Sequence, residues 1–206
     1  MIAIIDYGVG NLRSVAKAFE YIGQPVVVTS DPQAVLQADK VVLPGVGAFG
    51  KAMENLIERG MAPVVREVIG SGRPFLGICL GLQLLFEESA ETFGDREIAY
   101  PGLGILPGKV LRFPAGSGLK IPQIGWNQIR QFQDCPLFKE VADCSYAYFV
   151  HSYYVKPADK AMVACTTDYG IEYCSGVATG NLFAVQFHPE KSSAAGLQML
   201  RNFGAL

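Results

Sequence analysis

Cys79 is the residue whose neighbours suit it best to nucleophilic chemistry. Residues 77–81, Gly-Ile-Cys-Leu-Gly, stand where an apolar strand turns at once into a helix, the setting in which Gly-x-Ser-x-Gly forms a nucleophile elbow. The flanking glycines permit the sharp turn, and the unpaired N–H groups at the start of the helix favour a thiolate over a thiol. The alternative is a small buried core residue. We expect a nucleophile that is exposed at the C-terminal edge of the sheet.

His188 and Glu190 are the candidate base and its acidic partner. They follow an apolar run and are separated by Pro189, which disfavours the α region for His188 and leaves it extended. Residues two apart in extended chain point the same way, so Glu190 can hold one ring nitrogen while the other meets a thiol. The alternative is a surface glutamate beside a packed histidine. His151 lies in an aromatic stretch, and we expect it to be a core or pocket-lining residue.

A glycine-rich turn over residues 44–50 follows another apolar strand. Its backbone N–H groups, together with that of Leu80, could stabilise the oxyanion of a tetrahedral intermediate. The spacing Gly45-x-Gly47-x-x-Gly50 also matches the dinucleotide fingerprint. However, it follows a later strand, and no acid at a strand end ~20 residues on could bind a ribose. A noncatalytic flavodoxin-like binding module therefore remains the alternative of a different class.

The elements that must position these residues alternate in the first half of the chain. Apolar runs and helical periodicities succeed one another there, which predicts βαβ units around a mostly parallel sheet with helices on both faces. The strands are apolar enough to be buried on both faces. We expect strands at residues 2–6, 26–29, 41–43 and 74–78, and helices at 11–22 with Asn11 as cap, 48–59, 63–70 and 80–89.

The second half of the chain has a different sequence pattern, in which short apolar runs are separated by glycine and proline. It predicts antiparallel strands or hairpins that extend the first sheet, followed by a final helix capped by Ser192 or Ser193 that runs through Phe203. We expect one α/β domain over residues 1–206, with antiparallel strands at residues 108–113, 124–129, 146–155 and 182–187.

Composition excludes several classes of protein. Seventeen Lys and Arg against nineteen Asp and Glu offer no basic excess for nucleic acid. Five cysteines without a C-x-x-C, and only two histidines, argue against a zinc site or a disulfide framework. No apolar run approaches a membrane span, and residues 1–6 lack the basic start of a signal peptide. We therefore expect a cytoplasmic protein with no metal, membrane or nucleic-acid partner.

Residues 44–47, 77–83 and 188–190 together resemble the class I glutamine amidotransferases, whose Cys-His-Glu triad hydrolyses glutamine to release ammonia. Within that class, residues 6–12, 125–127, 148–153 and 188–192 resemble the glutaminase subunits of imidazole glycerol phosphate synthases of histidine biosynthesis. The resemblance runs essentially end to end and implies a three-layer, flavodoxin-like fold without cofactor. Gln123 departs from it, because the family more often has His before Gly-Trp-Asn, which puts in doubt local detail at the partner surface. Glutaminase subunits of pyridoxal phosphate synthase are the alternative within the class.

The resemblance implies a role for each matching position. Cys79 would form the γ-glutamyl thioester, His188 would move the proton, and Glu190 would orient His188. The partner would be a TIM-barrel cyclase subunit, in a heterodimer, that uses the ammonia to make imidazole glycerol phosphate and an aminoimidazole carboxamide ribotide. A lone tryptophan is more often core than interface, but the polar Gln123, Asn127 and Gln128 around Trp126 leave both interpretations open. The remaining implied sites are an oxyanion hole of Val46, Gly47 and Leu80, L-glutamine contacts from Gly45, Gln83, Ser152 and Tyr153, and a cyclase interface of Asn11, Trp126 and Lys191.

Overall fold

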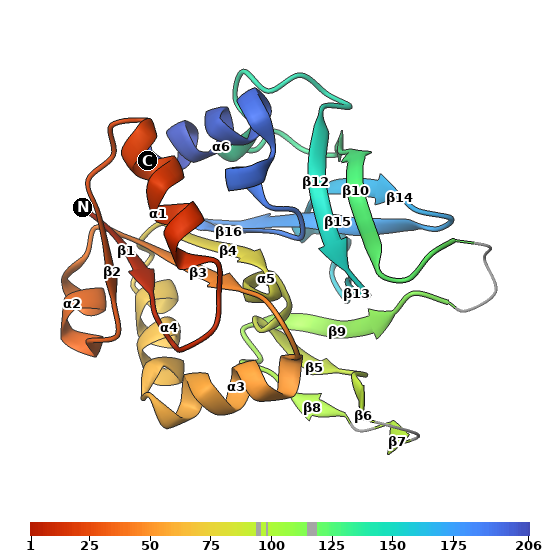
Figure 1. The fold of residues 1–206 in the computed structure, drawn as a ribbon, viewed down its shortest axis with the longest axis horizontal. Helices are drawn as coiled ribbons and strands as arrows, with labels where there is room; N and C mark the ends of the chain where they lie inside the picture. Colours follow the sequence, from red (N-terminus) through yellow and green to blue (C-terminus); the bar gives the residue numbers. More distant parts are fainter. Residues whose placement is uncertain (94–95, 98, 115–118) are drawn as a thin grey trace.

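A parallel sheet of short apolar strands, most of them from the first half of the chain, forms one side of the molecule (Figure 1). The computed structural model describes residues 1–93, 96–97, 99–114 and 119–206. In the sheet, β2 (Val26–Thr29), β1 (Ile2–Ile5), β3 (Lys40–Gly45) and β4 (Phe75–Cys79) lie side by side, and β16 (Leu182–Val185) joins them parallel to β4. Gly45 pairs with Cys79 and Val185 with Ile78, so the carboxyl ends of three strands meet around Cys79.

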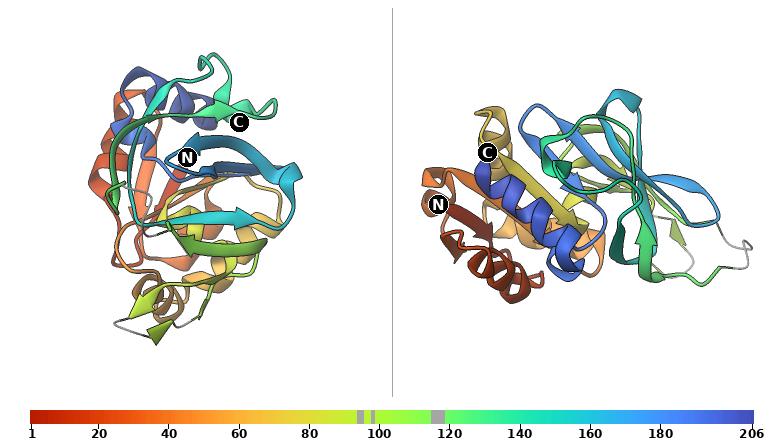
Figure 2. Two further views of the ribbon diagram at one scale, coloured as in Figure 1. Left: turned by 90° about the vertical axis from the view of Figure 1, so that its right-hand side faces the viewer. Right: turned by 90° about the horizontal axis from the view of Figure 1, so that it is seen from above.

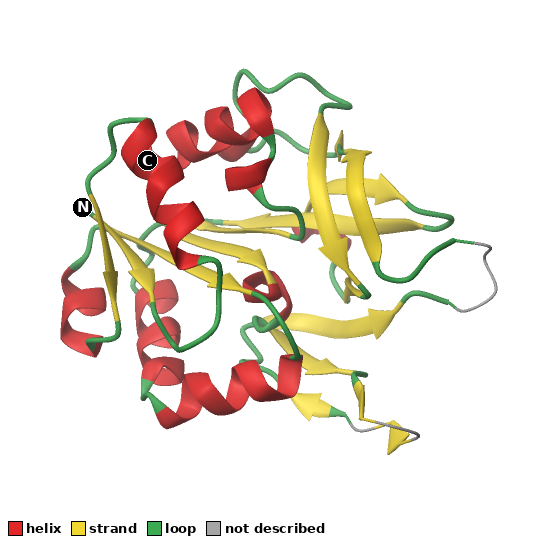
Figure 3. Cartoon of the chain, in the orientation of Figure 1, coloured by secondary structure: helices red, strands yellow, loops and turns green. Residues whose placement is uncertain are grey.

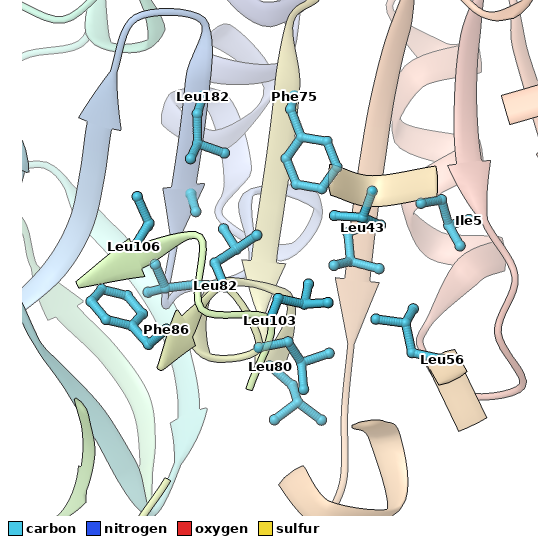
Figure 4. Packing of buried hydrophobic residues seen from close by; sticks show 14 of the residues in the cluster. Ile5, Leu43, Leu56, Phe75, Leu80, Leu82, Phe86, Leu103, Leu106 and Leu182 are labelled. Carbon is cyan, nitrogen blue, oxygen red and sulfur yellow. The ribbon is translucent and has the colours of Figure 1, made fainter. Parts of the chain in front are cut away.

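Helices cover both faces of this parallel half (Figure 3). On one face Phe19 of α1 and Phe203 of α6 pack with tilted rings whose centroids are 6.2 Å apart, in a cluster with Ile4 and Ile78. On the other face α2, α3 and α4 pack against a second cluster. That cluster continues past Phe75 to Phe86 and Leu106 in the later strands (Figure 4). The helices are α1 (Leu12–Tyr21), α2 (Pro32–Gln37), α3 (Phe49–Glu58), α4 (Met61–Gly70), α5 (Leu80–Gln83) and α6 (Ser193–Ala205).

Antiparallel strands extend the sheet beyond β16 and project away from the helices (Figure 2). The expectation was wrong for residues 124–129 and the first part of 146–155, which pair with each other in a separate sheet, and for 182–187, which also pairs parallel with β4. The order continues through β15 (Glu172–Thr179), β13 (Tyr153–Pro157), β9 (Leu106–Arg112), β5 (Phe86–Ser89) and β8 (Tyr100–Pro101), with β14 (Val163–Asp168) and β11 (Arg130–Gln131) branching from β15. A separate ribbon pairs β10 (Gln123–Gln128) with β12 (Tyr146–His151), and β6 (Thr92–Phe93) pairs with β7 (Arg96–Glu97). Single 3₁₀ turns are η1 (Pro136–Phe138), η2 (Lys160–Met162) and η3 (Pro189–Lys191).

Several boundary predictions were wrong. The helix expected over residues 80–89 ends at Gln83, because Phe86–Ser89 pairs with β9 as a strand. The expected strand over 146–155 breaks at Ser152 into β12 and β13, which belong to different sheets. The helix α2 was not expected, although Asp31 before a proline is a helix-start signal and its side chain accepts from the Gln33 N–H.

Two further expectations about local structure were wrong. Asn11 and Ser192 hold the N-cap positions of α1 and α6, but neither side chain makes a capping hydrogen bond. The second strand is not buried on both faces. It lies at the edge of the sheet, and Val28 is exposed. Within the described residues, no helix is long and apolar enough to span a membrane.

Candidate active site

Cys79 occupies a sharp turn between β4 and α5. Its φ of 57° and ψ of −111° lie where side-chain-bearing residues are rarely found, a strained conformation typical of nucleophile elbows. The glycines around it are required, since a Cβ on Gly81 would overlap the Leu43 carbonyl and one on Gly77 would lie 3.0 Å from the Ala184 methyl. The expectation of an exposed thiol was wrong, because Cys79 is 5% exposed and lies in the wall of a cavity.

His188 and Glu190 form the expected pair. His188 is extended, with φ of −103° and ψ of 96°, and its Nδ1 lies 2.8 Å from Glu190 Oε1. The side chains of both residues are buried. Two backbone bonds fix the histidine, because its N–H donates to the Tyr148 carbonyl and its carbonyl accepts from the Ser192 hydroxyl. The other ring nitrogen, Nε2, is buried and has no hydrogen-bond partner among the described residues.

The surroundings of His188 favour its protonated form. Burial lowers the pKa of the ring, but the interactions with Cys79 and Glu190 together outweigh burial and raise the pKa to about 10. The carboxylate on Nδ1 and the interaction with the Cys79 sulfur therefore favour an imidazolium, which can give a proton to a leaving group. This is the charge arrangement of a Cys-His-acid site.

Two buried glutamine side chains connect the cavity wall to the nucleophile, and sequence reasoning identified only one of them. Gln83 Nε2 donates to the Tyr153 carbonyl at 3.1 Å and to Gln186 Oε1 at 2.9 Å. Gln186 Nε2 in turn donates to Cys79 Sγ at 3.7 Å. Gln186 is fully buried, directly before the Phe187-His188 stretch that the sequence analysis examined. Its position beside Cys79 follows from the register of β16 on β4, which no local motif reveals.

A cavity of about 470 Å³ opens at Cys79, a size suited to a small-molecule ligand. Most of the residues expected to bind glutamine or its oxyanion line it, and Gly47 adopts the positive φ of 92° that its turn needs. Gly45 does not line it. A Cβ there would lie 2.6 Å from the Tyr7 hydroxyl, so Gly45 belongs to the packing behind the wall. The lining residues are Val46, Gly47, Ala48, Cys79, Leu80, Gln83, Glu91, Pro122, Val150, His151, Ser152 and Tyr153.

Glu91 is a charged lining residue that sequence reasoning missed. Its Oε2 accepts from the Gly50 N–H at 3.0 Å, which ties residues after β5 to the first turn of α3. The contact spans 41 positions in the sequence, and a lone glutamate carries no local signal for it.

His151 lines the cavity but is held as a neutral ring. Burial, helped by the nearby charge of His188, lowers the pKa of His151 to about 4 despite the raising effect of a hydrogen bond to the Tyr153 carbonyl. Its Nδ1 lies 2.7 Å from the Tyr153 carbonyl and therefore carries the proton, while Nε2 lies 3.2 Å from the Tyr173 hydroxyl. Gln123 Oε1 lies 2.9 Å from the same hydroxyl, so His151 Nε2 and Gln123 Oε1 share its one proton. Gln123 is thus buried in this cluster and is not itself exposed on the partner surface.

The expected interface residues gather on the β10–β12 ribbon and beside it. Trp126 pairs with Tyr148 in register, with ring centroids 6.1 Å apart, and Lys191 Nζ lies 5.7 Å above the Tyr148 ring. Asn11 begins α1, which contacts the η3 turn that carries Lys191. The ribbon face, as we call Ile124, Trp126, Gln128, Tyr146, Tyr148 and Val150, is broadly apolar, and Ile124, Trp126 and Tyr146 are exposed.

Comparison with known proteins agrees with this geometry. Residues 3–205 match the family model described as glutamine amidotransferase class-I. A protein of Geobacter sulfurreducens named imidazole glycerol phosphate synthase subunit HisH is 52% identical over 210 residues, which cover 100% of this chain and 98% of the relative. The subunit of the same name from Chlorobaculum tepidum is 53% identical over 204 residues, which cover 98% of both chains.

Solved structures confirm the expected fold class. A crystal structure described as a glutamine amidotransferase superposes with a TM-score of 0.74 at 17% identity, covering 100% of both chains. The structure of PurLQS from Thermotoga maritima gives a TM-score of 0.72 at 17% identity, covering 98% of this chain and 96% of the other. With the family model matching nearly its whole length, the chain belongs to the class I glutamine amidotransferases.

Proposed function

We propose that this chain is the glutaminase subunit of an imidazole glycerol phosphate synthase, which hydrolyses L-glutamine to glutamate and ammonia for histidine biosynthesis. The full-length likeness to HisH subunits carries the proposal and favours it over a pyridoxal phosphate synthase subunit. Cys79 in the cavity wall, and the buried His188–Glu190 pair that interacts with it, support the chemistry. The core cluster that reaches from Val65 to Val155 supports one domain over residues 1–206.

In the proposed mechanism, acylation starts at the Cys79 sulfur. The thiolate attacks the side-chain carbonyl carbon of glutamine, and the carbonyl electron pair moves onto oxygen. The C–N bond of the tetrahedral intermediate then breaks, and the Nε2 proton of His188 passes to the departing nitrogen, which leaves as ammonia. Glu190 holds Nδ1 throughout, so the ring keeps Nε2 directed at the sulfur.

Hydrolysis of the γ-glutamyl thioester completes the cycle. Water attacks the thioester carbonyl and gives one proton to Nε2 of His188. The C–S bond breaks and restores the thiolate, and the acid product loses its remaining proton as glutamate. The backbone N–H groups of Val46 and Leu80 would stabilise the oxyanion in both steps, with Gly47 allowing the turn to present them.

The cavity wall offers polar groups for the rest of the glutamine molecule. Both amide hydrogens of Gln83 are engaged by Tyr153 and Gln186, so its Oε1 is the atom left to accept from a ligand. Glu91 brings a carboxylate to the cavity, which suits the α-ammonium group. The backbone of Ser152 and Tyr153 closes the adjacent side.

The ribbon face is the surface that we propose docks the cyclase subunit, a TIM barrel, in a heterodimer. Exposed aromatic and apolar groups around Trp126, with Lys191 at the edge, form the kind of anchor that protein interfaces use. Val150 pairs with Ile124 and also lines the cavity, so the face adjoins the place where ammonia forms.

All five cysteines are free, which supports a location in the reducing cytoplasm.

Replacing the nucleophile tests the function. In the complex with its cyclase, Cys79→Ala should abolish glutamine-dependent synthesis while ammonium still supports it, because the ammonia is made in one chain and used in the other. A noncatalytic flavodoxin-like module predicts instead that glutamine turnover survives the change near its original rate. A separate variant, Trp126→Ala, tests the docking surface and should weaken copurification with the cyclase. Its outcome does not bear on the test of Cys79 as the nucleophile.

A further inference from the structure

Gln186 contacts the sulfur of Cys79 but belongs to no motif that the proposed mechanism uses. It follows β16, whose Val185 pairs with Ile78, and this register brings the Gln186 side chain alongside the nucleophile. Its backbone N–H donates to the Ser175 carbonyl at 2.9 Å, which fixes the residue between β15 and β4. A fully buried amide needs hydrogen-bond partners, and this one finds them in Gln83 and Cys79.

The hydrogen bonds that begin at the Tyr153 carbonyl determine which way the Gln186 amide points. The Tyr153 carbonyl can only accept, so Gln83 must present its Nε2 there. The same Nε2 reaches Gln186, which must therefore present Oε1 to it. The NH₂ group of Gln186 is thereby left facing Sγ, and the sulfur meets a donor rather than an acceptor.

We infer that Gln186 stabilises the thiolate of Cys79 and holds its sulfur in position for attack, an inference that rests on Cys79 being the nucleophile of the proposed function. A thiolate is a far better acceptor than a thiol, so an N–H aimed at sulfur favours the charged form. The hydrogen bonds from Gln83 keep this donor aimed while glutamine binds against the same wall. Gln83 thus serves the substrate with its oxygen and the nucleophile through its nitrogen.

Other groups also act on the sulfur and must be separated from Gln186. His188, with Glu190 behind it, interacts with Cys79 from the loop after β16. Tyr7, from the loop after β1, is fully buried with its hydroxyl unpartnered among the described residues, and burial together with Cys79 raises the pKa of Tyr7. Neither group contacts Gln186 through a hydrogen bond, so a change at Gln186 leaves both in place.

The pH profile of Cys79 alkylation measures the effect directly. We would measure the rate of modification by iodoacetamide in the full chain, alone and with its cyclase, by mass spectrometry of the Cys79 peptide. A Cys144→Ser background removes the exposed cysteine. Gln186→Met keeps the volume but removes the donor, and should move the midpoint of the profile upward by about one pH unit, equivalent to about tenfold slower alkylation at pH values well below the midpoint.

Two further variants keep the test decisive. Gln186→Glu still accepts from Gln83 but turns an acceptor toward the sulfur, so it should move the midpoint of the alkylation profile at least as far. It provides a second measurement if the methionine variant does not fold. Gln123→Met is the matched control, because Gln123 is an equally buried glutamine bonded to Tyr173, and its midpoint should stay unchanged.

The outcomes separate this inference from the proposed function. A midpoint unchanged in every folded Gln186 variant, with Cys79→Ala inactive, overturns the role of Gln186 alone. An equal shift in Gln123→Met would also overturn it, because loss of any buried amide would then suffice. Glutamine hydrolysis that persists in Cys79→Ala would instead overturn the proposed function.

Discussion

The two histidines of the chain are both buried near the same cavity, yet they are held in opposite protonation states. His188 is 2% exposed and its pKa is raised to about 10, whereas His151 is 6% exposed and its pKa is lowered to about 4. Burial acts in the same direction on both. The difference lies in their partners, because His188 meets the Glu190 carboxylate and the Cys79 sulfur, while His151 meets a backbone carbonyl and the Tyr173 hydroxyl.

The comparison shows that a countercharge, not burial, decides which histidine carries a proton. The two rings are also linked, since the charge of His188 contributes to the lowered pKa of His151. The protonated histidine can move a proton during the reaction, and the neutral one can only orient groups through fixed hydrogen bonds. Each of the following predictions tests that division.

The largest expected effect is on glutaminase activity of the complex. His188→Asn should lower the rate about 10³-fold or more, because asparagine cannot give the proton that the leaving nitrogen receives from the His188 imidazolium. His151→Asn removes a ring of similar size from the cavity wall and should stay within about tenfold. Steady-state glutamate release measures both variants, and equal losses would show that the comparison assigns the wrong base.

The second prediction removes the countercharge alone. Glu190→Gln can keep a hydrogen bond to Nδ1 but loses the negative charge, so activity should fall about 10²-fold, less than in His188→Asn. The pKa of His188 should fall from about 10, because one of the interactions that raises it is removed. NMR titration of the two ring signals checks this, and a His188 signal that does not move would contradict the role given to Glu190.

The triad was predictable from sequence because each half is a local motif. Gly-x-Cys-x-Gly marks an elbow, and His-Pro-Glu forces two side chains to the same side of an extended strand, which the 2.8 Å contact confirms. Gln186 was not predictable, because its contact with Cys79 depends on a β4–β16 register between segments 107 residues apart.

The same physical reason explains the errors in the fold. The run after Gln83 is apolar enough for a helix, and only the β9 partner makes residues 86–89 a strand. Val28 has the composition of a buried strand, and only its place at the sheet edge exposes it. Local patterns therefore predicted strand and helix positions, and tertiary pairing decided their ends and their exposure.

The third prediction uses stability at different pH values. His188 has its pKa raised above the ordinary value of 6.5, so its contribution is complete below pH 6.5 and is lost as the pH rises toward 10. His151 has its pKa lowered, so its contribution is complete above pH 6.5 and is lost as the pH falls through 4.

Chemical denaturation across this range should reveal the opposite slopes. His151→Asn should flatten the loss of stability on the acid side, a term of up to about 3 kcal/mol. His188→Asn should flatten the loss on the alkaline side instead. If the free energy of unfolding falls equally steeply with decreasing pH in His151→Asn and in the unchanged protein, the neutral state assigned to His151 is wrong.

The smallest expected effect concerns the hydroxyl that joins His151 to Gln123. Tyr173→Phe leaves the ring packed against Phe113 and Phe149 but removes the hydroxyl bonded to His151 Nε2 and Gln123 Oε1. The free energy of unfolding should fall by about 1–2 kcal/mol, because two buried polar groups lose a partner. Activity should change less than about threefold, since a neutral His151 takes no proton in the reaction. Tyr169→Phe is the matched control, because within the part of the chain that the structure describes its hydroxyl makes one exposed bond, to the Lys120 carbonyl, and its loss should cost less. An activity loss in Tyr173→Phe as large as that of Glu190→Gln would mean that both histidines take part in proton transfer.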